Sequence, residues 1–206
     1  MKNNFREKVK DMSRNHSIIF SIIAVGSTLI ADPVTEKIVN VFINDTYIPK
    51  IISEMLCGII MLVLGRIIFS GKENMGFQRR GFFYGIMLSW LFIFFGVNNF
   101  DFNYLNSNGI HIPSLGTIAG YAVYNMAIGF YEEVMMRGLV LNNFINLYGV
   151  SKKGIIYSVC ISSLIFGVAH LCNLVESPQL INATLSQVLY ASFIGMFFAS
   201  VYLRLC

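Results

Sequence analysis

The chain has 206 residues, of which 55% are hydrophobic and 13% are charged, and its formal net charge at pH 7 is +4. Soluble domains carry about a quarter charged residues, so this composition excludes an ordinary soluble domain. It predicts an all-α, polytopic transmembrane helical bundle. The positive charge does not indicate a nucleic-acid partner, because the basic residues lie in short loops between apolar segments.

Six apolar runs follow one another along the chain. The first, 17–31, comes after a polar, basic segment and ends at Asp32-Pro33. It is expected to be an uncleaved span rather than a signal peptide, because Leu29 stands where a cleavage site would have a small residue. The other runs are 48–69, 81–97, 115–148, 155–171 and 180–203, with a turn at 152–154. Each run is near or above the ~17–25 residues that cross a bilayer, so we predict six spans.

The loops between these runs alternate in charge. One set carries most of the basic residues: segment 1–16, loop 72–80, Lys152, Lys153 and Arg204. The opposite set carries the acidic residues Asp32, Glu36, Asp45, Asp101 and Glu176. By the positive-inside rule, this pattern predicts a multi-pass protein of the cell membrane, surrounded by membrane lipid, with both termini in the cytoplasm.

Glu132 and Glu133 stand side by side inside the fourth apolar run. Ionisable residues at membrane depth are costly, and they usually mark functional sites. Arg137 lies about one helical turn further on and is expected to pair with one of the two carboxylates. As a helix the fourth run would be about 50 Å long, so one of its ends should lie outside the hydrocarbon or along the cytoplasmic surface.

A helical hairpin would bring the glutamates level with His170. Glu132 lies 19 residues before Ser151, and His170 lies 19 residues after it. Adjacent residues of a helix point about 100° apart, so only one glutamate can face His170, and Arg137 or another helix can engage the other. We predict that the nearer carboxylate and the imidazole lie about 5–6 Å apart at most, separated by one bridging water.

Each of these residues also has a purely structural interpretation. The glutamates would then form a solvated pair at a helix end, bound to Arg137, and His170 would be a core histidine bonded to a backbone carbonyl. Phe166 precedes His170 by four residues and shares its helix face, so its ring can shape a pocket wall. Two carboxylates, a guanidinium and an imidazole at one level together favour a functional site.

The same residues resemble the motifs of a known family. Glu132-Glu133-Val-Met-Met-Arg137 is similar to the Glu-Glu-x-x-x-Arg motif of the CAAX-protease and bacteriocin-processing (CPBP, or Abi) membrane endopeptidases. Phe166-Gly-Val-Ala-His170, followed by Leu171-Cys172-Asn173, resembles the family's Phe-x-x-x-His motif. The sixth run, with Phe193-Ile-Gly195, is similar to the helix that comes next in the family. The resemblance divides the chain into a cytoplasmic N-terminus (1–16), N-terminal transmembrane helices (17–111) and CPBP-like catalytic-core helices (112–206).

The resemblance implies roles for the matching residues. One of Glu132 and Glu133 would activate a water for attack on a peptide carbonyl, and His170 would hold that water or stabilise the oxyanion. Arg137, Phe166 and Asn173 would be structural or supporting residues. One Glu and one His are too few ligands for a closed zinc site, and the chain has no His-Glu-x-x-His motif. The sequence therefore requires no cofactor and leaves a divalent metal such as zinc open.

The chain differs from the family pattern at its C-terminal end. The family's last motif is His-x-x-x-Asn (or Asp) on one further helix, whereas this sequence ends at Cys206 with no histidine after His170. Loss of a single oxyanion donor typically lowers the rate ~10²–10³-fold. From the sequence as written we therefore expect slow peptide hydrolysis or none.

These observations lead to two hypotheses from different functional classes. The first is an intramembrane endopeptidase in which a glutamate-activated water attacks a bond of a peptide or membrane-protein substrate. By resemblance, its setting would be bacteriocin processing, self-immunity or surface-protein maturation. The alternative is a non-catalytic membrane partner or regulatory protein that retains the family fold. A transporter is less favoured, because the sequence has no pair of interrupted helices of the kind that form transporter sites.

Overall fold

The computed structural model of the chain describes residues 2–69 and 114–205. Every element in these two ranges is helical, which confirms the predicted all-α class. The helices are α1 (Lys2–Asn15), α2 (Ser17–Phe42), α3 (Ile48–Ile68), α6 (Leu115–Glu133), the π-helix η1 (Val134–Leu141), α7 (Asn142–Tyr148), α8 (Lys152–Ala169), α9 (Asn173–Glu176) and α10 (Ile181–Leu205). Two short 3-10 turns, His170–Cys172 and Pro178–Leu180, flank α9. The predicted third span, 81–97, lies outside the described residues.

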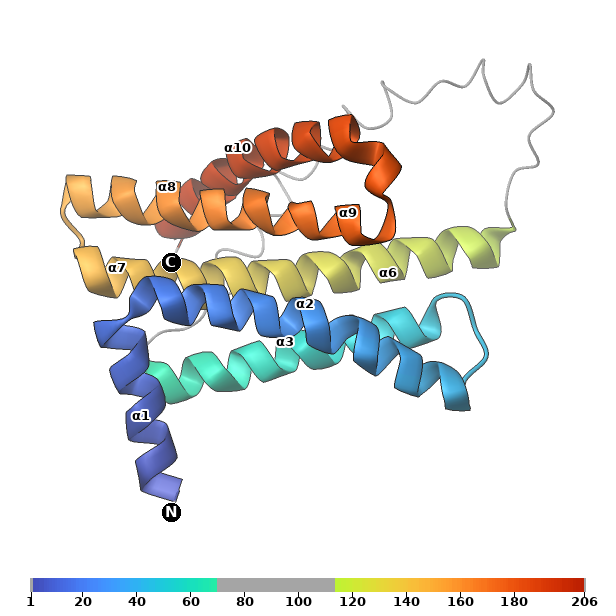
Figure 1. Cartoon of the computed structure of the whole chain (residues 1–206), viewed down its shortest axis with the longest axis horizontal. Coiled ribbons are helices and arrows are strands. Elements are labelled where there is room, and N and C mark those ends of the chain that lie inside the picture. The colour runs from blue at the N-terminus through green and yellow to red at the C-terminus, as the bar shows by residue number, and fades with distance from the viewer. Residues whose placement is uncertain (1, 70–113, 206) are drawn as a thin grey trace.

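The long helices form a bundle along one axis. Figure 1 shows α2, α3 and the continuous helix α6–η1–α7 running side by side, with α8 and α10 packed over them. Within residues 2–69 and 114–205, four helical stretches are long and apolar enough to cross a membrane: Ser17–Phe42, Ile48–Ile68, Lys152–Val175 and Pro178–Arg204. The predicted fourth run is one unbroken helix, and the N-terminal end of α6 projects beyond α8 and α9 (Figure 1).

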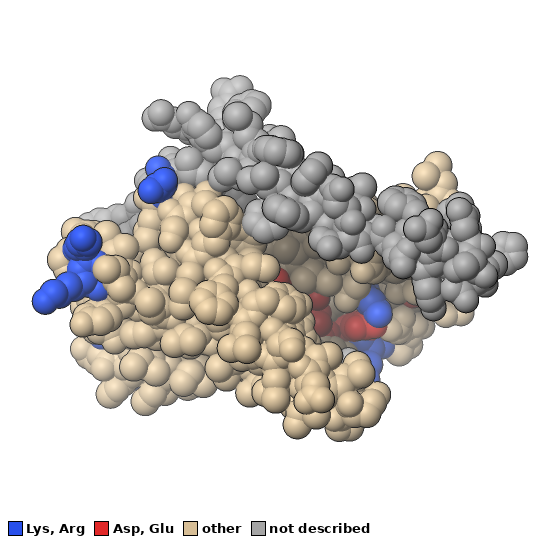
Figure 2. All heavy atoms as spheres, turned by 90° about the horizontal axis from the view of Figure 1, so that it is seen from above, with Lys and Arg blue, Asp and Glu red and all other residues tan. Residues whose placement is uncertain are grey.

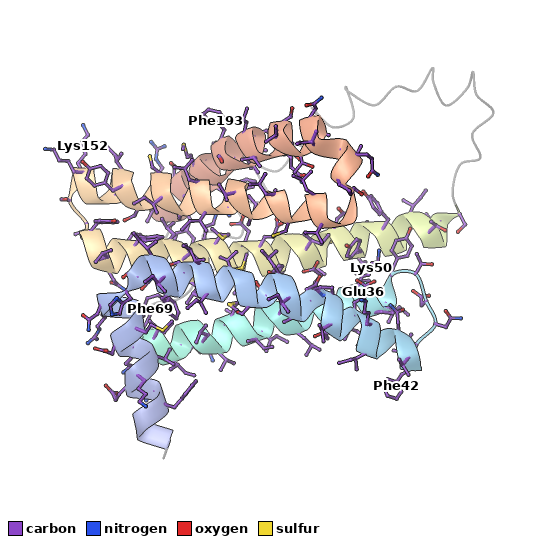
Figure 3. The ribbon with its side chains drawn as sticks, in the orientation of Figure 1. Glu36, Phe42, Lys50, Phe69, Lys152 and Phe193 are labelled. Atoms are coloured by element: carbon purple, nitrogen blue, oxygen red, sulfur yellow. The ribbon has the colours of Figure 1, made fainter. Side chains whose placement is uncertain are left out.

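The outer surface of the bundle is apolar. Large hydrophobic side chains are exposed on several helices, including Ile22 on α2, Ile60 on α3, and Leu189 and Phe193 on α10. Figure 3 shows Phe193 pointing away from the bundle. Soluble monomers rarely expose continuous apolar surface on this scale. We therefore interpret these side chains as lipid-facing, in agreement with the membrane class that the composition predicts.

The first span is longer than predicted. The sequence analysis placed its end at Asp32-Pro33, but α2 continues through Pro33 to Phe42. A proline inside a membrane helix is tolerated where neighbouring helices and hydroxyl side chains compensate the backbone. The carbonyl that loses its helical partner is that of Leu29, four residues before Pro33. Beside Pro33, the Ser53 hydroxyl of α3 donates a hydrogen bond to the Asp32 carbonyl at 2.7 Å and so joins α2 to α3. Asp32 and Glu36, which the sequence analysis assigned to a loop, therefore lie on a helix that packs against α3.

Side-chain caps explain where two other helices begin. Ser114 accepts a hydrogen bond from the Thr117 amide at the start of α6. Ser151 accepts one from the Gly154 amide at the start of α8. Such serine caps satisfy amides that have no partner within the helix. The second cap starts α8 at Lys152, so the predicted turn at 152–154 is corrected to Gly149–Ser151, where Gly149 has a φ of 79°.

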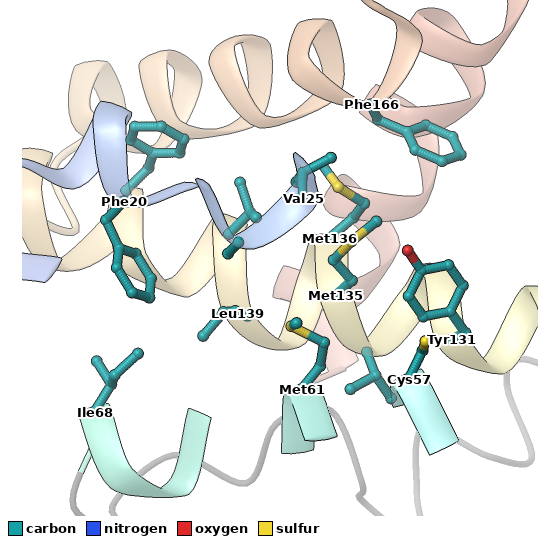
Figure 4. Packing of buried hydrophobic residues seen from close by; sticks show 14 of the residues in the cluster. Phe20, Val25, Cys57, Met61, Ile68, Tyr131, Met135, Met136, Leu139 and Phe166 are labelled. Atoms are coloured by element: carbon teal, nitrogen blue, oxygen red, sulfur yellow. The ribbon is translucent and has the colours of Figure 1, made fainter. Parts of the chain in front are cut away.

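The core lies around η1, all eight residues of which are buried. Figure 4 shows Met135, Met136 and Leu139 of η1 surrounded by side chains from α2, α3 and α8. The neighbours that it labels are Phe20, Val25, Cys57, Met61, Ile68, Tyr131 and Phe166. π-helical turns are rare and are often found at functional sites. This one directly follows Glu132 and Glu133.

The α1 helix lies across the direction of α2 and α3, at the end of the bundle that also holds the α7–α8 turn (Figure 1). Buried polar side chains hold this junction together. The Ser13 hydroxyl donates to Asn143 Oδ1 at 2.6 Å, and Asn143 Nδ2 donates to the Ser17 carbonyl at 3.2 Å. Hydrogen bonds of this kind fix helix positions where the surroundings offer no water.

Small residues let α8 and α10 approach closely. A Cβ atom added at Gly167 would overlap Ser192 Oγ and lie 2.6 Å from the Val188 carbonyl oxygen. We predict that Gly167→Ala destabilises the protein by about 1–3 kcal/mol, because a backbone carbonyl cannot move aside as a flexible side chain can. The midpoint of thermal unfolding in detergent measures this effect.

The matched control for this substitution is Gly129→Ala on α6, because no heavy atom lies within 4 Å of the position of its added Cβ. That change should leave the midpoint unchanged or raise it, because Ala is the better helix former by about 1 kcal/mol. Equal destabilisation by the two substitutions would contradict close packing at Gly167.

Candidate active site

Glu133 is the glutamate that pairs with Arg137. The carboxylate oxygen Oε1 of Glu133 lies 3.3 Å from Arg137 Nη1, and the two residues are four apart on one helix. The guanidinium is buried, whereas the Glu133 side chain is 47% exposed. This pairing was one of the two possibilities that the spacing left open, and it divides the adjacent glutamates into a paired and an unpaired one.

Arg137 joins three helices. Its guanidinium lies over the rings of Phe166 on α8 and Phe198 on α10, at 5.1 Å and 5.5 Å from the ring centroids. Its Nη2 atom donates to the Gly195 carbonyl of α10 at 3.4 Å. Arginine suits such a position, because its planar group stacks on aromatic rings while it donates hydrogen bonds. The geometry agrees with the supporting role expected for Arg137 and Phe166.

His170 comes directly after the last residue of α8, beside Phe166. The two rings meet edge to face, with centroids 4.9 Å apart. The Nδ1 atom of His170 lies 2.9 Å from the Phe166 carbonyl oxygen. A carbonyl can only accept, so Nδ1 carries the proton, and in the neutral imidazole Nε2 is left with a lone pair. The backbone bond expected of a structural histidine is therefore present, and it also fixes the orientation of Nε2.

Glu132 is partly buried and has no ion-pair or hydrogen-bond partner among the described residues. It lies within electrostatic range of both His170 and Arg137. The hairpin therefore brings Glu132 and His170 into one region, as the equal spacing about Ser151 predicts. No hydrogen bond joins them in the described part of the chain, and the bridging-water distance stays a prediction.

Asn173 connects two helices at the end of this region. Its Nδ2 atom donates to Gln187 Oε1 at 2.9 Å, which ties α9 to α10, and its side chain is exposed. This contact agrees with the supporting role expected for Asn173. His111, which precedes the fourth apolar run, lies outside the described residues.

Glu54 is a residue that the sequence analysis missed. It lies on α3, is only 8% exposed, and has no described hydrogen-bond partner for its Oε2 atom. It is within electrostatic range of Asp32, Glu36 and Glu132. The sequence signal for it is a single glutamate at the seventh position of the apolar run 48–69. This position is also compatible with a place near a helix end. Its approach to Glu132 depends on α3 packing against α6, which the sequence pattern does not specify.

The described residues hold no group of three or more His, Cys, Asp or Glu side chains placed to bind one metal ion. Cys57 is buried and Cys172 exposed, and both are free thiols.

Comparison with known families gave one match. Residues 114–205 match the family model described as type II CAAX prenyl endopeptidase Rce1-like. This segment contains Glu132, Glu133, Arg137, Phe166 and His170, and it falls inside the region 112–206 in which the sequence motifs occur. Neither a curated protein nor a solved structure gave a significant match to the chain.

Proposed function

We propose that this chain is a membrane-embedded endopeptidase that uses a glutamate-activated water, because residues 114–205 match the type II CAAX prenyl endopeptidase Rce1-like family model. The observation that carries this proposal is the division of the two adjacent glutamates. Glu133 is engaged by Arg137, whereas Glu132 has no described partner and lies near an imidazole of fixed orientation. An unpaired carboxylate beside an oriented imidazole is a suitable arrangement for general-base catalysis.

In this proposal Glu132 is the general base. Its carboxylate takes a proton from water, and the water oxygen forms a bond to the carbonyl carbon of the peptide. The tetrahedral intermediate then collapses with cleavage of the C–N bond. The proton held by Glu132 passes to the leaving nitrogen, so the carboxylate returns to its starting state.

The tautomer of His170 defines what this residue contributes. With the proton on Nδ1, the lone pair of Nε2 accepts a hydrogen bond from the water and orients it toward the substrate. The Phe166 carbonyl keeps the ring in place during this step. Oxyanion stabilisation by Nε2 would instead require a second proton, on Nε2 itself. We assign water orientation to His170 in the resting enzyme.

Hydrolysis in ¹⁸O-labelled water tests the proposed chemistry. The purified chain is incubated with a farnesylated CAAX peptide and with an unmodified apolar peptide, and the products are analysed by mass spectrometry. A direct attack by water places one ¹⁸O atom in the new carboxyl group. A folded chain that cleaves neither peptide, even in an incubation long enough to detect a rate lowered ~10²–10³-fold, would overturn the proposal and favour the non-catalytic membrane partner.

We further propose that both termini face the cytoplasm across the cell membrane. The end of α3, the start of α8 and the end of α10 lie at or near the end of the bundle where α1 meets α2 (Figure 1). These helix ends carry Arg66, Lys152, Lys153 and Arg204. Figure 3 shows Lys152 at this end and Glu36 and Lys50 toward the other. Cytoplasmic ends of membrane proteins are enriched in Lys and Arg. We expect tags on both termini to be inaccessible in intact cells; a C-terminal tag that is readable from outside would refute this orientation.

A further inference from the structure

Glu54 is an unusual residue for the interior of an apolar bundle. Its side chain is more than nine-tenths buried, and its Oε2 atom has no hydrogen-bond partner in the described part of the chain. An isolated polar atom in such a place costs free energy. Glu54 is therefore a candidate for binding a polar or charged group that the described residues do not supply.

Three further carboxylates extend from Glu54 along the bundle. Asp32 and Glu36 are four residues apart on α2, so they lie on the same side of that helix, and Glu132 lies on α6. Ser53, next to Glu54, donates hydrogen bonds to the carbonyl and to Oδ1 of Asp32, which fixes α2 against this part of α3. All three carboxylates are within electrostatic range of Glu54. We call these four residues (Glu36, Asp32, Glu54 and Glu132) the acidic path.

Among the described residues, Arg137 lies within electrostatic range of Glu132, but no cation is paired with the acidic path. None of its members forms an ion pair there. Arg137 is occupied by Glu133, and the Lys50 ammonium lies 5.5 Å from the centre of the Tyr124 ring. Figure 2 shows acidic side chains gathered in a hollow on one face of the molecule, with Lys or Arg side chains beside them. The carboxylates do not converge closely enough to share a metal ion.

We propose that the acidic path binds a cationic side chain of the peptide substrate, with Glu54 as its main ligand. Lysine and arginine side chains are long enough to reach a buried carboxylate while their peptide backbone stays near Glu132, and charge-assisted hydrogen bonds to carboxylates are the strong ones. The inference rests on the proposed peptidase function. It defines the substrate class as peptides that carry Lys or Arg close to the bond that is cleaved.

A binding experiment tests this proposal without requiring hydrolysis. Wild-type chain and Glu54→Gln are reconstituted in nanodiscs of neutral phosphatidylcholine, which avoids non-specific adsorption of cationic peptides. The probes are two fluorescein-labelled apolar peptides that differ at one position, Lys in one and norleucine in the other. Their affinities are measured by fluorescence anisotropy.

Wild-type chain should bind the Lys peptide about 10-fold or more tightly than the norleucine peptide, which corresponds to one charge-assisted hydrogen bond. Glu54→Gln should abolish this preference, and Glu7→Gln, on the exposed face of α1, should retain it. Equal binding of the two peptides by wild type would overturn the proposal, as would a preference that survives in Glu54→Gln. The latter result would show that Glu54 is a neutral, protonated core residue.

Two readouts keep this inference separate from the peptidase proposal. If Glu54→Gln folds poorly, Glu36→Gln serves as the second variant, and it should reduce the Lys preference by a smaller factor because Glu36 is less buried. An unchanged preference in that folded variant would contradict the acidic path. A Lys preference without any ¹⁸O incorporation would refute hydrolysis alone, whereas hydrolysis without a Lys preference would refute this inference alone.

Discussion

Glu132→Gln is expected to lower the rate of peptide hydrolysis by about 10²–10⁴-fold, the usual contribution of a general base. The amide has nearly the shape of the carboxylate, and no described ion pair is broken by the change. The loss should therefore appear in the rate of the chemical step and not in the amount of folded protein. Product formation per folded molecule, measured with the farnesylated and unmodified peptides, gives this rate.

Glu133→Gln is the closest comparison, because it makes the same chemical change at the next residue. It breaks the ion pair with Arg137, so it should lower stability and affect the rate per folded molecule less than Glu132→Gln does. Glu7→Gln controls for a change of charge alone. If Glu133→Gln abolished hydrolysis while Glu132→Gln did not, the roles of the two glutamates would be exchanged. If even the double Gln variant kept full biological activity, the non-catalytic alternative would be favoured.

The site could be predicted from the sequence as far as it depends on spacing along two helices. Equal distances from Ser151 place Glu132 and His170 at similar heights in any antiparallel hairpin, whatever the packing of the other helices. The pairing of Arg137 with a glutamate also follows from helical spacing, because residues four apart are neighbours on a helix surface. Which glutamate it takes depends on the local turn, and the structure assigns Glu133.

Features that depend on packing between helices could not be predicted in this way. The π-helical turn at Val134–Leu141 has no sequence signal comparable to a proline or a cap. The α2 helix continues past Pro33 and packs against α3, where the Ser53 hydroxyl contacts Asp32. The burial of Glu54 comes from packing of α3 against α2 and α6, which the pattern of α3 alone does not specify. Period and composition describe one helix at a time, so they miss such effects.

Arg137→Ala is expected to destabilise the protein by about 2–4 kcal/mol, because the guanidinium and its contacts are buried while the half-exposed Glu133 carboxylate that it leaves behind is partly solvated. The substitution removes the cation that balances Glu133 and the stacking on Phe166 and Phe198. It also removes the hydrogen bond to the Gly195 carbonyl. Unfolding by a titration of denaturing detergent in mixed micelles measures the effect. Arg66→Ala, which alters an exposed arginine at the end of α3, should change stability by no more than ~0.5 kcal/mol.

A second substitution separates the charge of Arg137 from its packing. In Arg137→Ala with Glu133→Gln, no carboxylate is left uncompensated at position 133, so part of the lost stability should return. Arg137→Lys keeps the charge but loses the planar stacking, and should fall between wild type and Arg137→Ala. Because Phe166 also carries the carbonyl that holds His170, the Lys variant should lower the hydrolysis rate per folded molecule as well. Wild-type stability and rate in Arg137→Lys would show that the stacked geometry is dispensable and that Arg137 acts by its charge alone.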